Sequence, residues 1–325
     1  MAVSINQVAQ GIFRVGPLES AGPGRRGHHT SYTSPYIVNG KDKAAVLEPG
    51  EDCQNAGTLE ALQACGIDAN KVAYIWTSHI HMHHIQAVPD LLKALPQSKF
   101  VLHPRGAPHV MEPTRLVQQS IEAWGDQCYG PFAPTPKERV LVVEDNQVLD
   151  LGGKQLNILY APGHAPHHMA LFEPDTRVLW PGDIGMVHYP GGERGHHDIR
   201  PPYFDLEKFL DSIERLRALK PSMLLTFGNP GGPNFTPDKT LRYTAEDHLA
   251  IERICYEGLK RKQGFKDIVR KVEEYEDAVG ANPGGSRRDS PEFSSGGLSG
   301  MIAYVVRKHP ELEMPADFSR RMRGG

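Results

Sequence analysis

The chain has 325 residues, of which 36 are basic and 39 acidic, giving a formal net charge of −3, and 39% are hydrophobic. This balance excludes a polybasic nucleic-acid binder as an interpretation of the whole chain, because neutralising phosphates requires a surplus of positive charge. It also disfavours disorder, since a chain of this length and apolar content can bury a sizeable core. The count of 16 histidines is the feature that needs explaining.

The sequence shows no targeting or membrane segment. The N-terminal residues lack the basic stretch and apolar run of a signal peptide, and no run of about 18 apolar residues occurs. The cysteines are widely spaced and form no CxxC pair, at Cys53, Cys65, Cys128 and Cys255. We therefore expect a soluble, cytoplasmic protein with reduced cysteines, a small-molecule substrate, and no nucleic-acid or membrane partner.

Short apolar runs that end at glycine or proline predict strands at 11–16, 35–39 and 44–48, the last two joined by a turn at 40–43. Apolar residues at helical spacing predict a helix at 55–65. The continuous apolar run at 72–76 indicates a strand buried on both faces. The elements expected beyond it are a helix near 85–95, strands at 99–103, 139–143, 147–151, 154–160, 168–173 and 177–180, a helix at 205–219 and a strand at 222–226.

This order predicts an α/β fold. Antiparallel strand pairs at the start and middle of the chain, each followed by strand-helix-strand units, favour two sheets packed face to face with helices outside, a four-layer αββα sandwich. After residue 240, helical spacing at 241–262, 265–279 and 298–308 surrounds a loop-like stretch at 281–297. We predict a catalytic domain at 1–240 and a helical C-terminal extension at 241–325.

The helices of this extension have an apolar side. Such a side packs on the sandwich or forms a dimer surface, and we expect a homodimer.

Four imidazoles lie within six residues, directly after the buried strand at 72–76: His79, His81, His83 and His84. Loops at the carboxyl ends of buried strands are where α/β folds assemble sites, and imidazole nitrogen suits zinc, iron and copper. The alternative is a surface histidine run, which the position and the apolar flanks disfavour. The sequence therefore predicts a metal site here.

The run resembles the HxHxDH signature of the metallo-β-lactamase superfamily, with His83 where that signature has aspartate. Two later stretches resemble further motifs of the superfamily in the same order, the glycine-histidine pair at 163–164 and the glycine-aspartate pair at 182–183. The resemblance covers roughly residues 10–230 and implies the same αββα sandwich.

Carried over by position, the resemblance implies ligands for up to two metal ions. The first ion would be held by His79, His81 and His164. His83 and His84 would face a second ion, and Asp183 would bridge the two.

The chain departs from the superfamily at two places. His83 still supplies a ligand atom but removes a negative charge, and no histidine follows the strand at 222–226, where Phe227 cannot ligate and Asn229 offers only an amide oxygen. Because a more positive centre retains a second cation less well, we hypothesise one firmly bound metal and a second that is weak or absent.

Other histidines have candidate roles around this centre. His167 and His168 follow His164, and strand alternation predicts that one points toward the site and one away. Candidates to replace the missing ligand or to line the substrate pocket lie in the long loop after Asp183, namely His188, His196 and His197. For His103 we favour a hydrogen-bonding role in a turn, and for His248 and His309 exposure to solvent.

The stretches 103–113 and 161–168 are similar to a bacterial subgroup of the superfamily that resembles a zinc-dependent hydrolytic dehalogenase of a chlorinated aromatic nitrile. That resemblance implies an interface metal held by a histidine and an acidic residue three positions later. His109 and Glu112 have this spacing.

The reaction that these residues favour is hydrolysis by a metal-bound hydroxide, since a metal ion lowers the pKa of its water toward neutrality. The expected electrophile is an ester, lactone, thioester or activated aromatic carbon. Asp183 and His83 are the candidate proton acceptors. Zn(II) is the expected metal, one or two per chain, with Fe(II) or Mn(II) as alternatives; the alternative functions are a mononuclear iron dioxygenase and a decayed site that serves binding or sensing.

Overall fold

A computed structural model describes residues 3–16, 34–124, 132–185, 194–195, 199, 203–227, 232–281 and 291–318. The chain divides into two compact units. The first unit consists of Met1–Tyr160, His167–Gly182 and Ser222–Phe235, and the second of Ala161–Pro166, Asp183–Pro221 and Thr236–Gly325. The domain boundary that we placed at residue 240 stays a prediction.

The first unit contains a mixed seven-stranded sheet in the order β1-β2-β3-β4-β5-β6-β7. Strands β1 to β4 pair antiparallel, and β4 to β7 pair parallel. The strands are β1 Ile5–Ala9, β2 Ile12–Val15, β3 Tyr36–Asn39, β4 Ala44–Leu47, β5 Val72–Trp76, β6 Lys99–Leu102 and β7 Val140–Val142. The parallel half matters for function, because the carboxyl ends of its strands meet at one edge of the sheet.

A second sheet in the same unit has five strands in the order β12-β11-β10-β9-β8. Strands β8 to β11 pair antiparallel, while β12 runs parallel to β11. The strands are β8 Val148–Asp150, β9 Gln155–Tyr160, β10 Met169–Glu173, β11 Val178–Trp180 and β12 Met223–Leu224.

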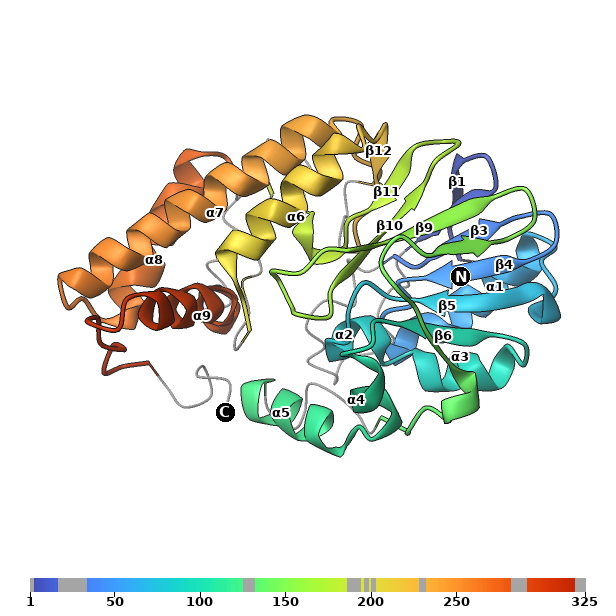
Figure 1. Ribbon diagram of the computed structural model, residues 1–325, viewed down its shortest axis with the longest axis horizontal. Coiled ribbons are helices and arrows are strands. Elements are labelled where there is room, and N and C mark those ends of the chain that lie inside the picture. The colour runs from blue at the N-terminus through green and yellow to red at the C-terminus, as the bar shows by residue number, and fades with distance from the viewer. Residues whose placement is uncertain are drawn as a thin grey trace. The chain divides into compact units, whose positions relative to one another are not determined.

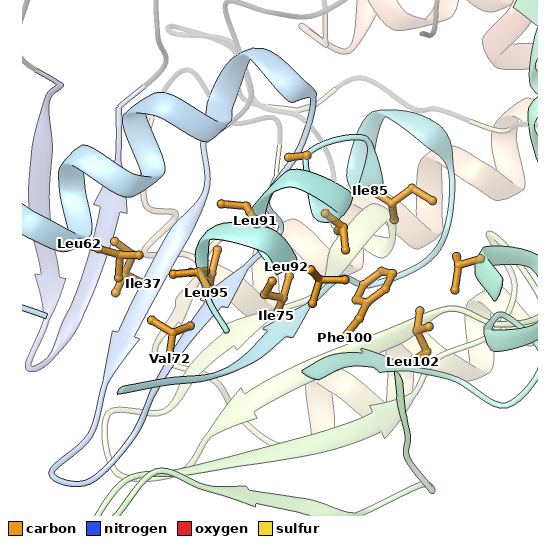
Figure 2. Close-up of a cluster of buried hydrophobic side chains, with 14 of the residues drawn as sticks. Ile37, Leu62, Val72, Ile75, Ile85, Leu91, Leu92, Leu95, Phe100 and Leu102 are labelled. Carbon is orange, nitrogen blue, oxygen red and sulfur yellow. The ribbon is translucent and has the colours of Figure 1, made fainter. Parts of the chain in front are cut away.

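One apolar cluster joins the seven-stranded sheet to helices on its outer face. The helices of this unit are α1 Asn55–Ala64, α2 Met82–Ile85, α3 Val88–Ala94, α4 Ala107–Met111 and α5 Thr114–Trp124. Figure 2 shows Leu62 of α1 beside Ile37 of β3, and Leu92 of α3 beside the strand residues Ile75 and Phe100. The buried side chains of this cluster are almost fully excluded from solvent, so the helices cover the outer face of the parallel strands.

A second apolar cluster lies between the two sheets. It joins inward residues of the first sheet, such as Val38 and Trp76, to residues of the second sheet, such as Ile158 and Trp180. Two sheets packed face to face with helices outside confirm the predicted α/β class and sandwich core.

The second unit is helical in its C-terminal part, which confirms the predicted helical C-terminal region. Its helices are α6 Leu206–Ala218, α7 Pro237–Lys260, α8 Phe265–Ala278 and α9 Pro291–Lys308, drawn in yellow to red in Figure 1. The loop predicted at 281–297 is wrong over its second half, because α9 begins at Pro291, a residue suited to the first turn of a helix. His248, which we expected to be exposed, is buried in α7 and stacks on Phe209.

The helix predicted near 85–95 corresponds to α3, and the short helix α2 before it was not predicted. The N–H of Ala87 donates to the carbonyl oxygen of Gly50 at 2.9 Å, so it does not continue the hydrogen bonding of α2, and α3 begins at Val88 with Pro89 in its first turn. Strand β1 and helices α4 and α5 were not predicted. Among the described residues, no helix is long and apolar enough to cross a membrane.

Candidate metal centre

The carboxyl ends of two parallel neighbours, β4 and β5, position the centre of the first unit. Leu47 of β4 pairs with Trp76 of β5, so the residues that follow the two strands emerge side by side. Glu48 follows β4, and the segment from Thr77 to His79 follows β5. The histidine run thus begins at the edge of the sheet where α/β folds place their ligands.

The four histidines of the run lie close together, as predicted. The Nε2 atom of His79 is 2.7 Å from the Nδ1 atom of His81, and the ring centroids of His79 and His84 are 4.2 Å apart. The rings of His83 and His84 are 4.4 Å apart. Three of the four are almost completely buried, His81 being the more exposed one, so this is no surface run. Their roles as ligands remain predictions.

Glu48 is a member of this group that the sequence analysis missed. Its carboxylate is 1% exposed and lies 2.7 Å from His84 Nδ1. It also accepts hydrogen bonds from the Ser78 N–H at 2.9 Å and the Thr77 hydroxyl at 3.2 Å. Glu48 has a positive φ of 49°, an uncommon conformation for a non-glycine residue that often marks a functional position.

The contact between Glu48 and His84 fixes the chemistry of the imidazole. When Nδ1–H donates to the carboxylate, the lone pair of the ring is on Nε2, which is the tautomer that a metal ligand needs. A signal for Glu48 was present in the sequence, because a carboxylate directly after a buried apolar strand is unusual.

His167 and His168 both lie near the cluster. Their ring centroids are 6.3 and 5.3 Å from that of His79. His168 is buried and His167 half-buried, so the prediction that one of the two points away from the cluster is wrong. Gly182, with φ +56°, lies against the ring of His168, and a Cβ there would collide with it.

Phe227 follows β12 and contacts the same cluster. Its ring stacks on His84 with a centroid separation of 4.1 Å and an interplanar angle of 27°. It is 5.9 Å from the ring of His83. A phenylalanine therefore occupies this side of the cluster.

The second unit holds the other two predicted ligands together. The Nε2 atom of His164 is 3.3 Å from the Oδ2 atom of Asp183, and their side chains are 0% and 15% exposed. The preceding Gly163, with φ +134°, lies so close to the backbone of Phe209 that any Cβ would collide with it. The hydroxyl of Ser212 donates to the carbonyl of Pro162 at 2.7 Å, which ties this turn to helix α6. A side chain at residue 163 is thus excluded by packing as well as by the backbone conformation.

His103, after β6, has the hydrogen-bonding role in a turn that we predicted. Its Nδ1 accepts the N–H of Arg105 at 2.9 Å, and its ring lies 4.2 Å from that of Tyr160. Burial, together with the charge of Arg105, lowers the pKa of His103 to about 4. His103 is therefore neutral at pH 7.

The carboxyl of Glu51, in the first unit, has a displaced pKa. Burial, and then the charge of Asp52, raises the pKa of Glu51 to about 7.

Several candidates cannot be placed. His188, His196, His197 and Asn229 lie outside the described residues. His109 and Glu112 are exposed at helix α4 and just after it, and their predicted role at a dimer interface is untested.

Among the described side chains, His79, His81, His83, His84, His164 and Asp183 offer ligand atoms for a metal ion. A family model described as the metallo-beta-lactamase superfamily matches residues 30–228. The chain belongs to the metallo-β-lactamase superfamily.

Curated members of the superfamily show modest identity to this chain. A metallo-beta-lactamase fold-containing protein of Sulfurisphaera tokodaii is 29% identical over 163 residues, which cover 48% of this chain and 59% of that protein. A human acyl-coenzyme A thioesterase is 22% identical over 233 residues, 68% of this chain and 80% of the thioesterase. The chain thus spans less than two thirds of the length of the archaeal relative. Superfamily members with this fold include hydrolases.

Solved structures show the same fold. A metallo-beta-lactamase family protein of Thermus thermophilus has a TM-score of 0.65 and 17% identity, with 94% of this chain and 95% of that one covered. The metallo-β-lactamase fold is therefore found in this chain.

Proposed function

We propose that the protein is a metal-dependent hydrolase that attacks an acyl carbon in an ester, lactone or thioester. The observation that carries the proposal is the buried histidine cluster after β5, in which the Glu48 carboxylate, 2.7 Å from His84 Nδ1, holds one imidazole in a ligand tautomer. Buried imidazoles with such a carboxylate partner are typical of metal centres.

The donor set fits a divalent metal. The ring nitrogens of His79 and His81 lie 2.7 Å apart, so both are close enough to reach one ion. Imidazole and carboxylate are both ligands that zinc takes in proteins. We propose zinc, held first by His79, His81 and His164.

The remaining ligand roles follow the order of the superfamily's motifs. We propose that His83 and His84 face a second, weakly held ion and that Asp183 is shared between the two.

When bound, the metal would lower the pKa of a water molecule and polarise the electrophile. The residues of the chain would orient the attacking water and accept its proton. Asp183, whose carboxylate is partly exposed and 3.3 Å from His164, is suited to accept a proton from the attacking water. His83 would do so when it is not a ligand. The pair of Glu48 and His84 keeps its ring fixed throughout, so that little reorganisation accompanies the reaction.

The substrate class rests on similarity. The human relative is named an acyl-coenzyme A thioesterase, and its matched region covers two thirds of this chain. Thioesters and oxygen esters present the same kind of electrophilic carbon. Displacement at an activated aromatic carbon, as in the dehalogenase that the subgroup resembles, needs the same machinery and is tested alongside.

We also propose that the protein is a homodimer, which light scattering after size exclusion would test.

The test starts with elemental analysis of protein purified without chelator, followed by turnover of p-nitrophenyl acetate, a lactone, acetyl-coenzyme A and a chlorinated aromatic nitrile. We expect zinc, hydrolysis of an acyl substrate, loss of activity on chelation and recovery with zinc. His79→Ala should abolish metal binding, whereas His309→Ala, in the second unit and paired with Glu311, should not.

Other outcomes would contradict the proposal. Iron with oxygen uptake would indicate a dioxygenase, and the absence of both metal and turnover would indicate a binding module. Turnover confined to the aromatic nitrile would leave the metal centre in place and reassign the electrophile.

A further inference from the structure

One aromatic ring that contacts the histidine cluster belongs to Phe227 and has no nitrogen. Phe227 is 6% exposed, its centroid lies 4.1 Å from that of His84 and 5.9 Å from that of His83, and the two histidine rings are 4.4 Å apart. Three rings from two distant chain segments thus share one corner of the cluster. Only two of them carry a lone pair that a metal can bind.

The backbone of Thr226 and Phe227 is held by hydrogen bonds from Tyr36, the first residue of β3, and from Ser34. The hydroxyl of Tyr36 donates to the carbonyl of Thr226 at 2.8 Å, and the N–H of Ser34 donates to the carbonyl of Phe227 at 3.2 Å. Gly50 lies beside the ring, where an added Cβ would be 3.4 Å from Phe227 Cε2. A different side chain at residue 227 would therefore enter the same corner.

The two histidines beside Phe227 are already arranged for a metal ion. Glu48 orients His84, and His83 is buried beside it. Structural zinc sites have four protein ligands, and catalytic ones have three. Among the described residues, the side with His83 and His84 has two ligands of its own, and under the proposed ligand set its third ligand, Asp183, is shared with the first ion. This side therefore lacks a third ligand of its own.

We infer that Phe227 limits the centre to one firmly held metal ion, because its ring withholds a ligand from the side formed by His83 and His84. The inference rests on the proposed metal centre and names the residue that sets its metal content. Substituting a donor for Phe227 should create a second firm site, whereas substituting another apolar side chain should not.

The experiment compares wild type with Phe227→His, Phe227→Cys and Phe227→Leu. Each protein is loaded with excess Zn²⁺, desalted, and analysed for bound zinc per chain by mass spectrometry. Phe227→Cys offers a second donor in a smaller side chain, in case histidine disturbs the packing. Phe227→Leu is the matched control, since it also removes the stacking on His84 but adds no donor.

We expect wild type and Phe227→Leu to retain the same amount of zinc, and at least one donor variant to retain one equivalent more. The added site should also survive competition with a chelator at concentrations at least tenfold above those that strip excess zinc from the wild type. With Co²⁺ in place of zinc, the added equivalent should produce additional visible absorption.

Equal zinc content in all folded variants would overturn the inference, as would two equivalents in the wild type or a gain in Phe227→Leu. Because the readout is metal content, these outcomes leave the proposed hydrolysis intact. Absence of zinc from every protein would instead refute the metal centre itself.

Discussion

Replacing Glu48 with glutamine perturbs the metal centre with almost no change in shape. The carboxylate accepts from three donors, His84 Nδ1, the Ser78 N–H and the Thr77 hydroxyl, at 2.7 to 3.2 Å. An amide has one oxygen and one NH₂ group, so at least one of these donors would face another donor. If the NH₂ group faces His84, the imidazole must accept at Nδ1, which moves its proton to Nε2 and removes the lone pair that the metal needs.

The expected magnitude follows from these contacts. Loss of an outer partner of a ligating histidine typically weakens metal binding by about 10- to 100-fold, which corresponds to about 1.4 to 2.8 kcal/mol of binding free energy. A buried donor left without an acceptor also lowers the free energy of unfolding by about 1 to 3 kcal/mol. Zinc affinity measured by competition with a chromogenic chelator, and urea unfolding of the metal-free protein, separate the two effects.

Glu173→Gln is a matched control. Glu173 is also fully buried in the first unit, accepts from the N–H and the hydroxyl of Thr176, and pairs with Lys154 at 3.4 Å. We expect Glu173→Gln to lower the free energy of unfolding about as much as Glu48→Gln does, while its zinc affinity stays that of the wild type. If Glu48→Gln binds zinc as the wild type does, or if both variants lose affinity equally, Glu48 does not act through His84.

Three further predictions concern stability. Thr226→Val should raise the free energy of unfolding by about 1 kcal/mol in urea titrations, because the Thr226 hydroxyl is buried without a hydrogen-bond partner among the described residues; a decrease would contradict this. Since the folded state holds the pKa of His103 at about 4 against an ordinary 6.5, the unfolded chain takes up the proton first as the pH falls, so stability should be lost from pH 6.5 toward pH 4. Urea unfolding at pH 7 and pH 5 should show a smaller loss for His103→Gln, and an equal loss would refute the assignment. Arg194→Ala leaves the buried carboxylate of Asp247 without its guanidinium partner and should cost about 3 kcal/mol, whereas Arg242→Ala, which breaks an exposed ion pair, should cost less than about 1 kcal/mol; equal losses would show that burial is not the cause.

Local patterns were sufficient for most of the elements. The run at 72–76 is apolar throughout because β5 is covered on both faces, and its boundaries were predicted correctly. The short helix α2 was not predicted, and its separation from α3 depends on a hydrogen bond from Ala87 to Gly50, a residue remote in sequence. Strand β1 is only partly buried, so its apolar pattern is weak and pairing with β2 decides its conformation.

By itself, the sequence determined the order of strands and helices, the α/β class and the position of the histidine run after β5, because spacing along the chain controls each of these features. Tertiary structure alone decided which side chains meet that run. Glu48 reaches His84 because β4 and β5 are parallel neighbours, and Phe227 reaches the same ring from the end of β12 in the other sheet. Such contacts join residues far apart in the chain through strand pairing and sheet packing, and no local pattern encodes them.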